Sequence, residues 1–153
     1  MQLHGKRVVV TGASQGLGRE LCKMLLESGA HVIAVARSEE KLLDFESHLK
    51  QCKENFTYVV CDVTNEEQII KAENEIKSNG AHIDILINNA GVWTDLALEE
   101  MDSSLRKKAF DTNALGNINF TYAMLPLLAK AKHGKVMNVI SIAGNEYGKS
   151  GDW

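Results

Sequence analysis

Stretches of consecutive apolar residues alternate along this chain with stretches in which apolar residues recur every three or four positions. Continuous apolar runs are typical of strands that are buried on both faces of a parallel sheet. Spacing by three and four is typical of helices with one buried face. The runs predict five strands, at residues 6–11, 31–36, 56–61, 83–87 and 135–140.

The segments between the first three strands predict two helices. We expect the first over about residues 16–27, ended by Gly29 in a left-handed conformation. Its apolar residues that should face the sheet are Leu17, Leu21, Met24 and Leu25. Ser38 is suited to the N-cap of the second helix, because its hydroxyl can accept a hydrogen bond from a backbone N–H of the first turn. That helix carries Leu42, Leu43, Phe45 and Leu49.

Three more helices are predicted in the second half of the chain. Thr64 and Glu67 have the spacing of a capping box that opens the third helix. A fourth helix should start near Asp102. Asn113 begins, or lies just inside, a fifth helix that reaches about residue 132, and Pro126 interrupts it and can kink it.

Strands that alternate with helices indicate an α/β fold, a doubly wound parallel sheet. Right-handed crossovers give the strand order 3-2-1-4-5, with a ligand site at the carboxyl ends of strands 1 and 4. A length of 153 residues predicts a single domain over residues 1–153.

Charge and cysteine content narrow the class of protein. Seventeen basic against twenty acidic residues give a net charge of −3, which argues against a nucleic-acid or anionic membrane surface. The start of the chain is too short and polar for a signal peptide, and no apolar run has the length of a membrane span. The odd number of cysteines, without C-x-x-C or a nearby histidine cluster, predicts free thiols, no metal site and a cytoplasmic location.

A glycine-rich loop follows the first strand, in the sequence V-V-V-T-G-A-S-Q-G-L-G-R-E from Val8 to Glu20. Gly12, Gly16 and Gly18 lack a Cβ, so the backbone can turn tightly and approach a ligand. The loop leads into a helix N-terminus, where free N–H groups favour an anion such as a diphosphate. The spacing G-x-x-x-G-x-G differs from the common dinucleotide fingerprint, and an ordinary glycine-bearing turn is the alternative.

The end of the second strand bears on the choice of cofactor. In dinucleotide-binding folds an acidic residue there binds the ribose 2′-OH of NAD, whereas an arginine accommodates the 2′-phosphate of NADP. The sequence Ala36-Arg37-Ser38 has no acid, and the guanidinium of Arg37 can pair with a phosphate. We therefore expect NADP rather than NAD. A solvated surface arginine is the alternative.

Four further motifs follow the glycine-rich loop in order: C-D-V from Cys61, N-N-A-G from Asn88, N-A-L-G from Asn113 and V-I-S-I-A-G around Ser141. With T-G-A-S-Q-G-L-G they make the chain resemble the short-chain dehydrogenase/reductase family over residues 5–145. The resemblance implies hydride transfer between a nicotinamide and a small-molecule carbonyl or secondary alcohol. It also implies a homo-oligomer through the helix that begins at Asn113.

The resemblance assigns roles to particular residues. Asn113 and Ser141 match catalytic positions, where the asparagine holds a water in a proton relay and the serine polarises the substrate oxygen. Helix capping is the alternative for Asn113 and for Asp62, and a plain turn is the alternative for N-N-A-G. The residues implied in cofactor binding are Gly12, Ser14, Gln15, Gly16, Leu17, Gly18, Arg37, Asp62, Val63, Asn89, Ala90 and Gly91.

The family's catalytic Tyr-x-x-x-Lys motif does not occur in these residues. Gly151, not a lysine, stands four positions after Tyr147, and Lys149 has the wrong spacing to share its helix face. The sequence is therefore interpreted as the cofactor-binding portion of an NADP-dependent oxidoreductase, C-terminally incomplete, with strand 5 at an open edge. The alternatives are an inactive short form that binds nucleotide or pairs with a full-length relative, and a truncated product that folds poorly.

Overall fold

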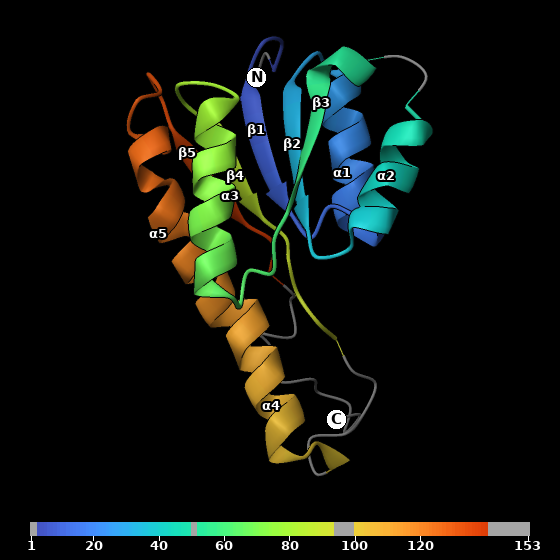
Figure 1. Ribbon diagram of the computed structural model, residues 1–153, viewed down its shortest axis with the longest axis vertical. Coiled ribbons are helices and arrows are strands. Elements are labelled where there is room, and N and C mark those ends of the chain that lie inside the picture. The colour runs from blue at the N-terminus through green and yellow to red at the C-terminus, as the bar shows by residue number, and fades with distance from the viewer. Residues whose placement is uncertain (1–2, 50–51, 94–99, 141–153) are drawn as a thin grey trace, which may run out of the picture.

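Five parallel strands form one sheet in the order β3-β2-β1-β4-β5 (Figure 1), which confirms the predicted order. The computed structural model describes residues 3–49, 52–93 and 100–140. β2 has the predicted bounds, and the other strands differ by one or two residues at their ends. Pairing sets their length, since β5 pairs with β4 from Ile85↔Lys135 to Asn88↔Asn138 and ends there. Their bounds are β1 Arg7–Thr11, β2 His31–Ala36, β3 Phe56–Val60, β4 Ile85–Asn88 and β5 Lys135–Asn138.

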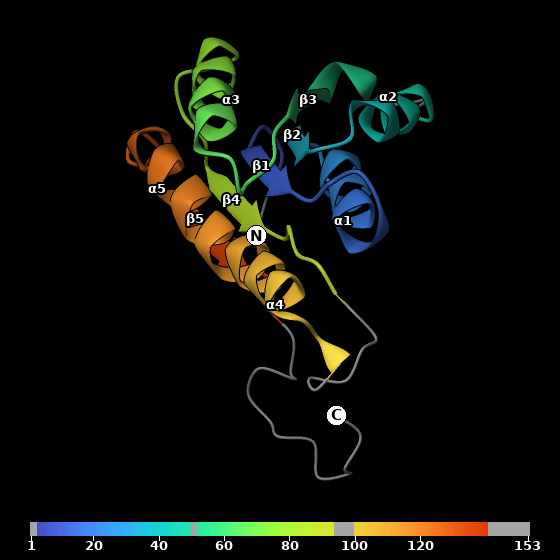
Figure 2. The same ribbon diagram turned by 60° about the horizontal axis from the view of Figure 1, so that its bottom comes forward.

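Helices cover the two faces of the sheet (Figure 2), with α1 and α2 on one side and α3 and α5 on the other. Side chains alternate along β1, so that Val8 and Val10 pack toward α1 and α2, while Val9 packs toward α3 and α5. This burial on both faces explains the continuous apolar runs. The helices are α1 Gly16–Glu27, α2 Glu39–Ser47, α3 Glu66–Ser78, α4 Ser103–Phe110 and α5 Asn117–Leu128, with a short 3-10 helix at Lys53–Asn55.

The rotation of α1 about its axis differs from the prediction. Leu17 and Met24 are 58% and 64% exposed and do not face the sheet. The buried residues of α1 are Gly18, Cys22, Leu25 and Leu26. The prediction is confirmed for Leu25, which is buried, and for Leu21, which packs against the same core, but it is wrong for Leu17 and Met24. Gly18, which has no side chain to mark it as apolar, lies against the residues that follow β1 and sets which face of the helix turns inward.

Among the capping residues predicted for the first three helices, Ser38 and Gly29 are confirmed and Thr64 is wrong. Ser38 Oγ accepts from Lys41 N at 3.4 Å as the N-cap of α2, and Gly29 follows α1 with a φ of +79°. The N-cap of α3 is Asn65, whose Oδ1 accepts from Gln68 N at 3.0 Å, and not Thr64. The Thr64 hydroxyl instead donates to Asp62 Oδ1 at 2.7 Å, so the capping box does not form.

The predicted fourth and fifth helices form one continuous helical run. It begins at the N-cap Asp102, passes through α4, a π-helical turn at Asp111–Gly116 and α5, and ends at Leu128. Asn113 therefore lies within the π-helical turn and is not a helix N-cap. The run ends before residue 132 because the chain turns back at Gly134, where a Cβ would lie 2.4 Å from Leu128 O. Pro126 lies inside α5, and α4 extends beyond the carboxyl ends of the strands (Figure 1).

A buried carboxylate joins the amino ends of β1 and β4. Asp84 accepts hydrogen bonds from Lys6 Nζ at 2.8 Å and Arg7 N at 3.0 Å, and His82 Nε2 lies 3.4 Å from it. Burial by itself would raise the pKa of Asp84, but the hydrogen bonds from Lys6 and Arg7 and the charges of Lys6 and His82 lower the pKa below its ordinary value. The ionised carboxylate thus stabilises the fold.

The carboxyl ends of the same two strands are joined through the buried Thr11. Its Oγ1 accepts hydrogen bonds from Asn89 N and Ala90 N, both at 3.0 Å. In the opposite direction, Asn89 Nδ2 donates to Thr11 O at 3.0 Å and to Gly12 O at 3.3 Å. These bonds fix the start of the glycine-rich loop against the residues that follow β4.

We expect Asp84→Asn to lower the free energy of unfolding by about 1–3 kcal/mol at neutral pH, because charge-assisted hydrogen bonds to Lys6 and Arg7 are lost. Since the folded pKa is lowered, this stability is present above the ordinary pKa of 3.8 and is lost as the pH falls toward the folded pKa. Urea unfolding across acidic pH should show the two proteins converge. An equal difference at every pH would contradict this account. Glu20→Gln, which breaks an exposed pair with Lys23, should have little effect.

Thr11→Val keeps the side-chain volume but removes the acceptor for two backbone N–H groups. The variant should lose about 1–3 kcal/mol of unfolding free energy, because these partly buried donors then lack a partner. Thr11→Ser keeps the hydroxyl and should lose about 0.8 kcal/mol, the value of one methyl group. Thermal or urea unfolding of the two variants tests this order, and equal losses would contradict the role of the hydroxyl.

Candidate functional site

A cavity of about 340 Å³ opens at the carboxyl ends of the strands, beside the glycine-rich loop. The structure brings every residue predicted for cofactor binding to its wall. These are Gly12, Ser14, Gln15, Gly16, Leu17, Gly18, Arg37, Asp62, Val63, Asn89, Ala90 and Gly91. Sequence reasoning missed Ala36, Ser38, Lys41, Cys61 and Thr112, which also line it. Lys41 could have been found from the Ser38 N-cap, since it lies in the first turn of a helix that begins at this edge.

Two glycines of the loop are required by how closely it packs. A Cβ on Gly18 would lie 2.3 Å from Gly12 O and 2.5 Å from Asn89 Nδ2, and Gly12, at a φ of +66°, would place a Cβ 2.8 Å from Ala90 Cα. A side chain on Gly18 would push α1 away from the residues that follow β1 and β4, and a side chain on Gly12 would push those two segments apart. The start of α1 is thus held directly over the sheet edge.

The other side of the loop faces open space. Gly16 has a φ of +54°, and nothing lies within 4 Å of where its Cβ would stand. The side chain of Gln15, the N-cap residue of α1, makes no capping hydrogen bond. The loop therefore combines an approachable backbone with a helix N-terminus that its cap side chain does not cover. Both features suit the diphosphate of a dinucleotide.

Arg37 and Asp62 stand at the ends of β2 and β3. An Arg37 guanidinium nitrogen lies 3.7 Å from Asp62 Oδ2, a loose ion pair in which the arginine side chain is 56% exposed. Asp62 Oδ1 also accepts from Thr64 N at 2.9 Å. Asp62 thus orders the turn before α3, although it is not the helix cap. Arg37 keeps enough exposed surface to contact an anion in the cavity.

The two asparagines of N-N-A-G have different partners. Asn89 contributes to the Thr11 bonds described above. Asn88 is 1% exposed and joins β4 to its neighbours, because its Nδ2 donates to Thr121 Oγ1 at 2.7 Å and to Asn138 Oδ1 at 2.8 Å. The motif therefore fixes β4 against β1, β5 and α5 and does more than form a plain turn.

Asn113 lies outside the first cavity and lines a second one, of about 500 Å³, between α5 and β5. Its Oδ1 accepts from Val92 N at 2.8 Å and its Nδ2 donates to Val92 O at 3.0 Å. Asn117 Nδ2 donates to Asn113 O at 2.9 Å. The side chain of Asn113 is therefore taken up by the segment that leads from β4, next to Gly91. Ser141, Tyr147 and Lys149 lie outside the described residues.

The second cavity belongs to an apolar face that the described residues leave uncovered. Every residue of β5 is exposed, and β5 stands at the edge of the described sheet, as predicted. The exposed apolar residues that line this cavity are Ile118, Tyr122, Leu125, Val136, Val139 and Ile140. Exposed apolar faces are typical of surfaces that contact further protein or an apolar ligand.

The cysteine that lines the first cavity is not a nucleophile at neutral pH. Burial, with the charge of Asp62 as a smaller cause, raises the pKa of the Cys61 thiol to about 12. Burial does the same for Cys22, and all three cysteines are free. Within the described ranges, no group of three or more potential ligands could hold a metal ion, and no helix has the length and apolarity to span a bilayer.

Proteins with similar sequences are dehydrogenases and reductases. The family model for short chain dehydrogenases matches residues 6–151. A "Dehydrogenase/reductase SDR family member 7B" of Xenopus laevis is 33% identical over 143 residues, which cover 90% of this chain and 44% of that protein. A "Probable NADP-dependent dehydrogenase" of Haemophilus influenzae is 33% identical over 137 residues, 89% of this chain and 53% of that protein.

Solved structures with a similar fold are also short chain dehydrogenases. The crystal structure of an Escherichia coli CFT073 protein, assigned as a short chain dehydrogenase and complexed with NADPH, is similar with a TM-score of 0.88 at 28% identity. The match covers 95% of this chain and 62% of that one. The chain spans about half the length of the curated relatives it matches. With a Rossmann-like sheet, the loop at its edge and a family model that covers nearly all of its length, the chain belongs to the short-chain dehydrogenase/reductase family.

Proposed function

We propose that this chain is the cofactor-binding part of an NADP-dependent oxidoreductase that acts on a small-molecule carbonyl or secondary alcohol. The observation that carries the proposal is the first cavity, where the glycine-rich loop, Arg37, Asp62 and the N-N-A-G segment converge from separate parts of the chain. The residues fit a dinucleotide because the open side of Gly16 admits a diphosphate at the start of α1.

Each part of the cavity has a role in this proposal. Backbone N–H groups of residues 15–17 bind the diphosphate. The carboxylate of Asp62 accepts from the adenine amino group, and Val63 packs on the adenine ring. Asn89, Ala90 and Gly91 meet the ribose at the end of β4. The hydrogen bonds between Thr11 and Asn89 hold the glycine-rich loop and the N-N-A-G segment at a fixed separation. Binding of the cofactor therefore has a low entropic cost, because these segments are already ordered.

Arg37 supports NADP over NAD. It directly follows β2, at the position that faces the adenosine ribose in this fold, and neither Ala36 nor Ser38 beside it has a carboxylate to accept from a 2′-OH. Its partner Asp62 is 3.7 Å away, a separation at which a phosphate can compete for the guanidinium. The NADP-dependent name of one relative and the NADPH bound to a structural neighbour are consistent with this choice.

The family resemblance assigns the chemistry to two residues, Ser141 and Asn113. The bound NADP would supply or accept the hydride. Ser141 would donate a hydrogen bond to the substrate oxygen and polarise it. Asn113 would act through its backbone and the π-helical turn around it, because its side chain is bonded to Val92. π-helical turns of this kind are frequent at functional sites.

A second function is favoured by the uncovered face and by the sequence itself. None of the 153 residues forms a Tyr-x-x-x-Lys pair, and α5 and β5 carry exposed apolar residues, namely Ile118, Tyr122, Leu125, Val136 and Met137. A chain with these properties would bind nucleotide and pair with a further polypeptide that covers this face, without turnover of its own. Loss of a general acid typically reduces the rate by about 10²–10⁴.

Fluorescence titration with NADPH and NADH tests the cofactor proposal. We expect saturable binding that prefers NADPH. Arg37→Ala should weaken NADPH binding about 10–100-fold, the value of a hydrogen bond to a charged group, and leave NADH binding unchanged. Arg106→Ala, on α4 and outside the cavity lining, is the matched control. Equal affinity for both cofactors would contradict the NADP assignment, and binding of neither would contradict the nucleotide-binding function.

Oxidation of NADPH with a panel of aldehydes and ketones separates the two functions. We expect NADPH binding with turnover at least about 100-fold below that of a relative with the Tyr-x-x-x-Lys pair, measured in parallel. Turnover at the relative's rate would contradict the inactive form. It would also require an acid other than the missing tyrosine, and Ser141→Ala would then show whether the proposed oxygen-binding hydroxyl takes part.

A further inference from the structure

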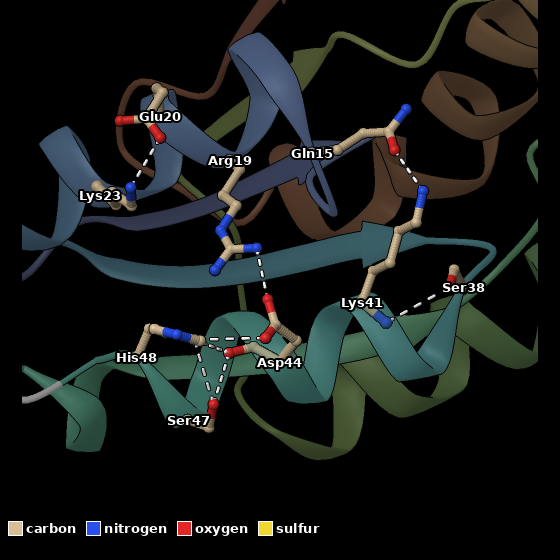
Figure 3. Close-up of polar contacts among 9 residues, drawn as sticks. All are labelled: Gln15, Arg19, Glu20, Lys23, Ser38, Lys41, Asp44, Ser47 and His48. Atoms are coloured by element: carbon tan, nitrogen blue, oxygen red, sulfur yellow. Dashed lines mark hydrogen bonds and ion pairs between the residues drawn. The ribbon is translucent and has the colours of Figure 1, made fainter.

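Lys41 reaches from α2 to the glycine-rich loop at the rim of the first cavity (Figure 3). Its Nζ donates to Gln15 Oε1 at 2.5 Å, across 26 positions of sequence. The residue's place on α2 is set by Ser38, whose hydroxyl accepts from Lys41 N. Both Lys41 and Gln15 line the cavity, so the contact lies where the adenosine end of a dinucleotide would enter.

Lys41 differs from the other described charged residues of the cavity wall in having no partner of opposite charge there. Among the described residues that line it, only Arg37, Lys41 and Asp62 carry a formal charge. Arg37 is paired with Asp62, so the excess positive charge of the wall resides on Lys41. The acids of the first turn of α2, Glu39 and Glu40, are exposed and are not part of the lining.

The contact between Lys41 and Gln15 is not needed to hold α1 against α2. Arg19 NH1 donates to Asp44 Oδ2 at 2.7 Å, and the same guanidinium lies 4.9 Å from the centre of the Phe45 ring (Figure 3 shows Arg19 and Asp44). Both interactions join the same two helices farther from the cavity. The ammonium of Lys41 is therefore available for another partner.

We propose that Lys41 is a second specificity-determining residue for the 2′-phosphate of NADP, which it binds together with Arg37. The inference rests on the function proposed above. On binding, Lys41 Nζ exchanges the neutral amide oxygen of Gln15 for an anionic phosphate oxygen. Charge-assisted hydrogen bonds are roughly twice as strong as neutral ones. The exchange is also inexpensive, because Gln15 is exposed and its released amide is hydrated.

Titration of Lys41→Met tests the proposal, since methionine keeps the apolar stem without the charge. We expect the Kd for NADPH to rise about tenfold and the Kd for NADH to change less than about twofold. Lys23→Met is the matched control, because Lys23 pairs with Glu20 on the outer part of α1. The NADPH effect should shrink at high ionic strength.

Two more substitutions separate a charge effect from a structural one. Lys41→Arg keeps the charge and should retain the NADPH preference. Lys41→Gln can still bond to Gln15 but has no charge, and should behave like Lys41→Met. Titration with adenosine 2′-monophosphate and adenosine 5′-monophosphate gives a second readout: only binding of the 2′ compound should weaken in the neutral variants.

The outcomes distinguish this inference from the proposed function. If the wild-type chain prefers NADPH and the neutral variants of Lys41 keep that preference, the role of Lys41 is contradicted and the proposed function stands. If Lys41→Met weakens NADPH and NADH equally and Lys41→Gln restores both, Lys41 is only a structural tie and the inference is again contradicted. If the wild-type chain binds neither cofactor, both proposals fail together.

Discussion

The close approach of three backbone segments is the constraint on which the rest of the structure depends. The end of β1, the residues after β4 and the first turn of α1 meet at separations that leave no room for a Cβ on Gly12 or Gly18. The hydroxyl of Thr11 and the amide of Asn89 satisfy the backbone groups exposed by this meeting. Packing and polar satisfaction thus act on the same few residues.

The position of the cavity follows from this constraint. Once α1 starts directly over the sheet edge, the adjoining ends of β2 and β3 form the opposite wall, with Arg37 and Asp62 at its rim. The net charge of the cavity wall then depends on side chains from separate segments of the chain: Arg37 after β2, Lys41 from α2 and Asp62 after β3. The backbone and small residues form the scaffold of the cavity, whereas the formal charges at its rim come from Arg37, Lys41 and Asp62.

Three predictions, for the rotation of α1, the N-cap of α3 and the place of Asn113, failed because contacts with other residues decided the outcome. Apolar periodicity placed Leu17 on the buried face of α1, but the fit of Gly18 against the residues that follow β1 decided the rotation of the helix. Thr64 and Asn65 could both cap α3, and the choice depended on the hydrogen bond that Thr64 makes to Asp62. Asn113 was expected at or near a helix start, but its amide pairs with Val92, 21 positions away.

The sequence by itself determined the order of elements and the sheet topology, because apolar runs, glycine spacing and right-handed crossovers are properties of local chain chemistry. Through the resemblance of its motifs to a known family, it also pointed to most of the residues that line the first cavity. Only the tertiary structure decided the contact between Lys41 and Gln15 and the place of Asn113 in a π-helical turn. These features depend on which distant segments meet, and no periodicity along the chain records that.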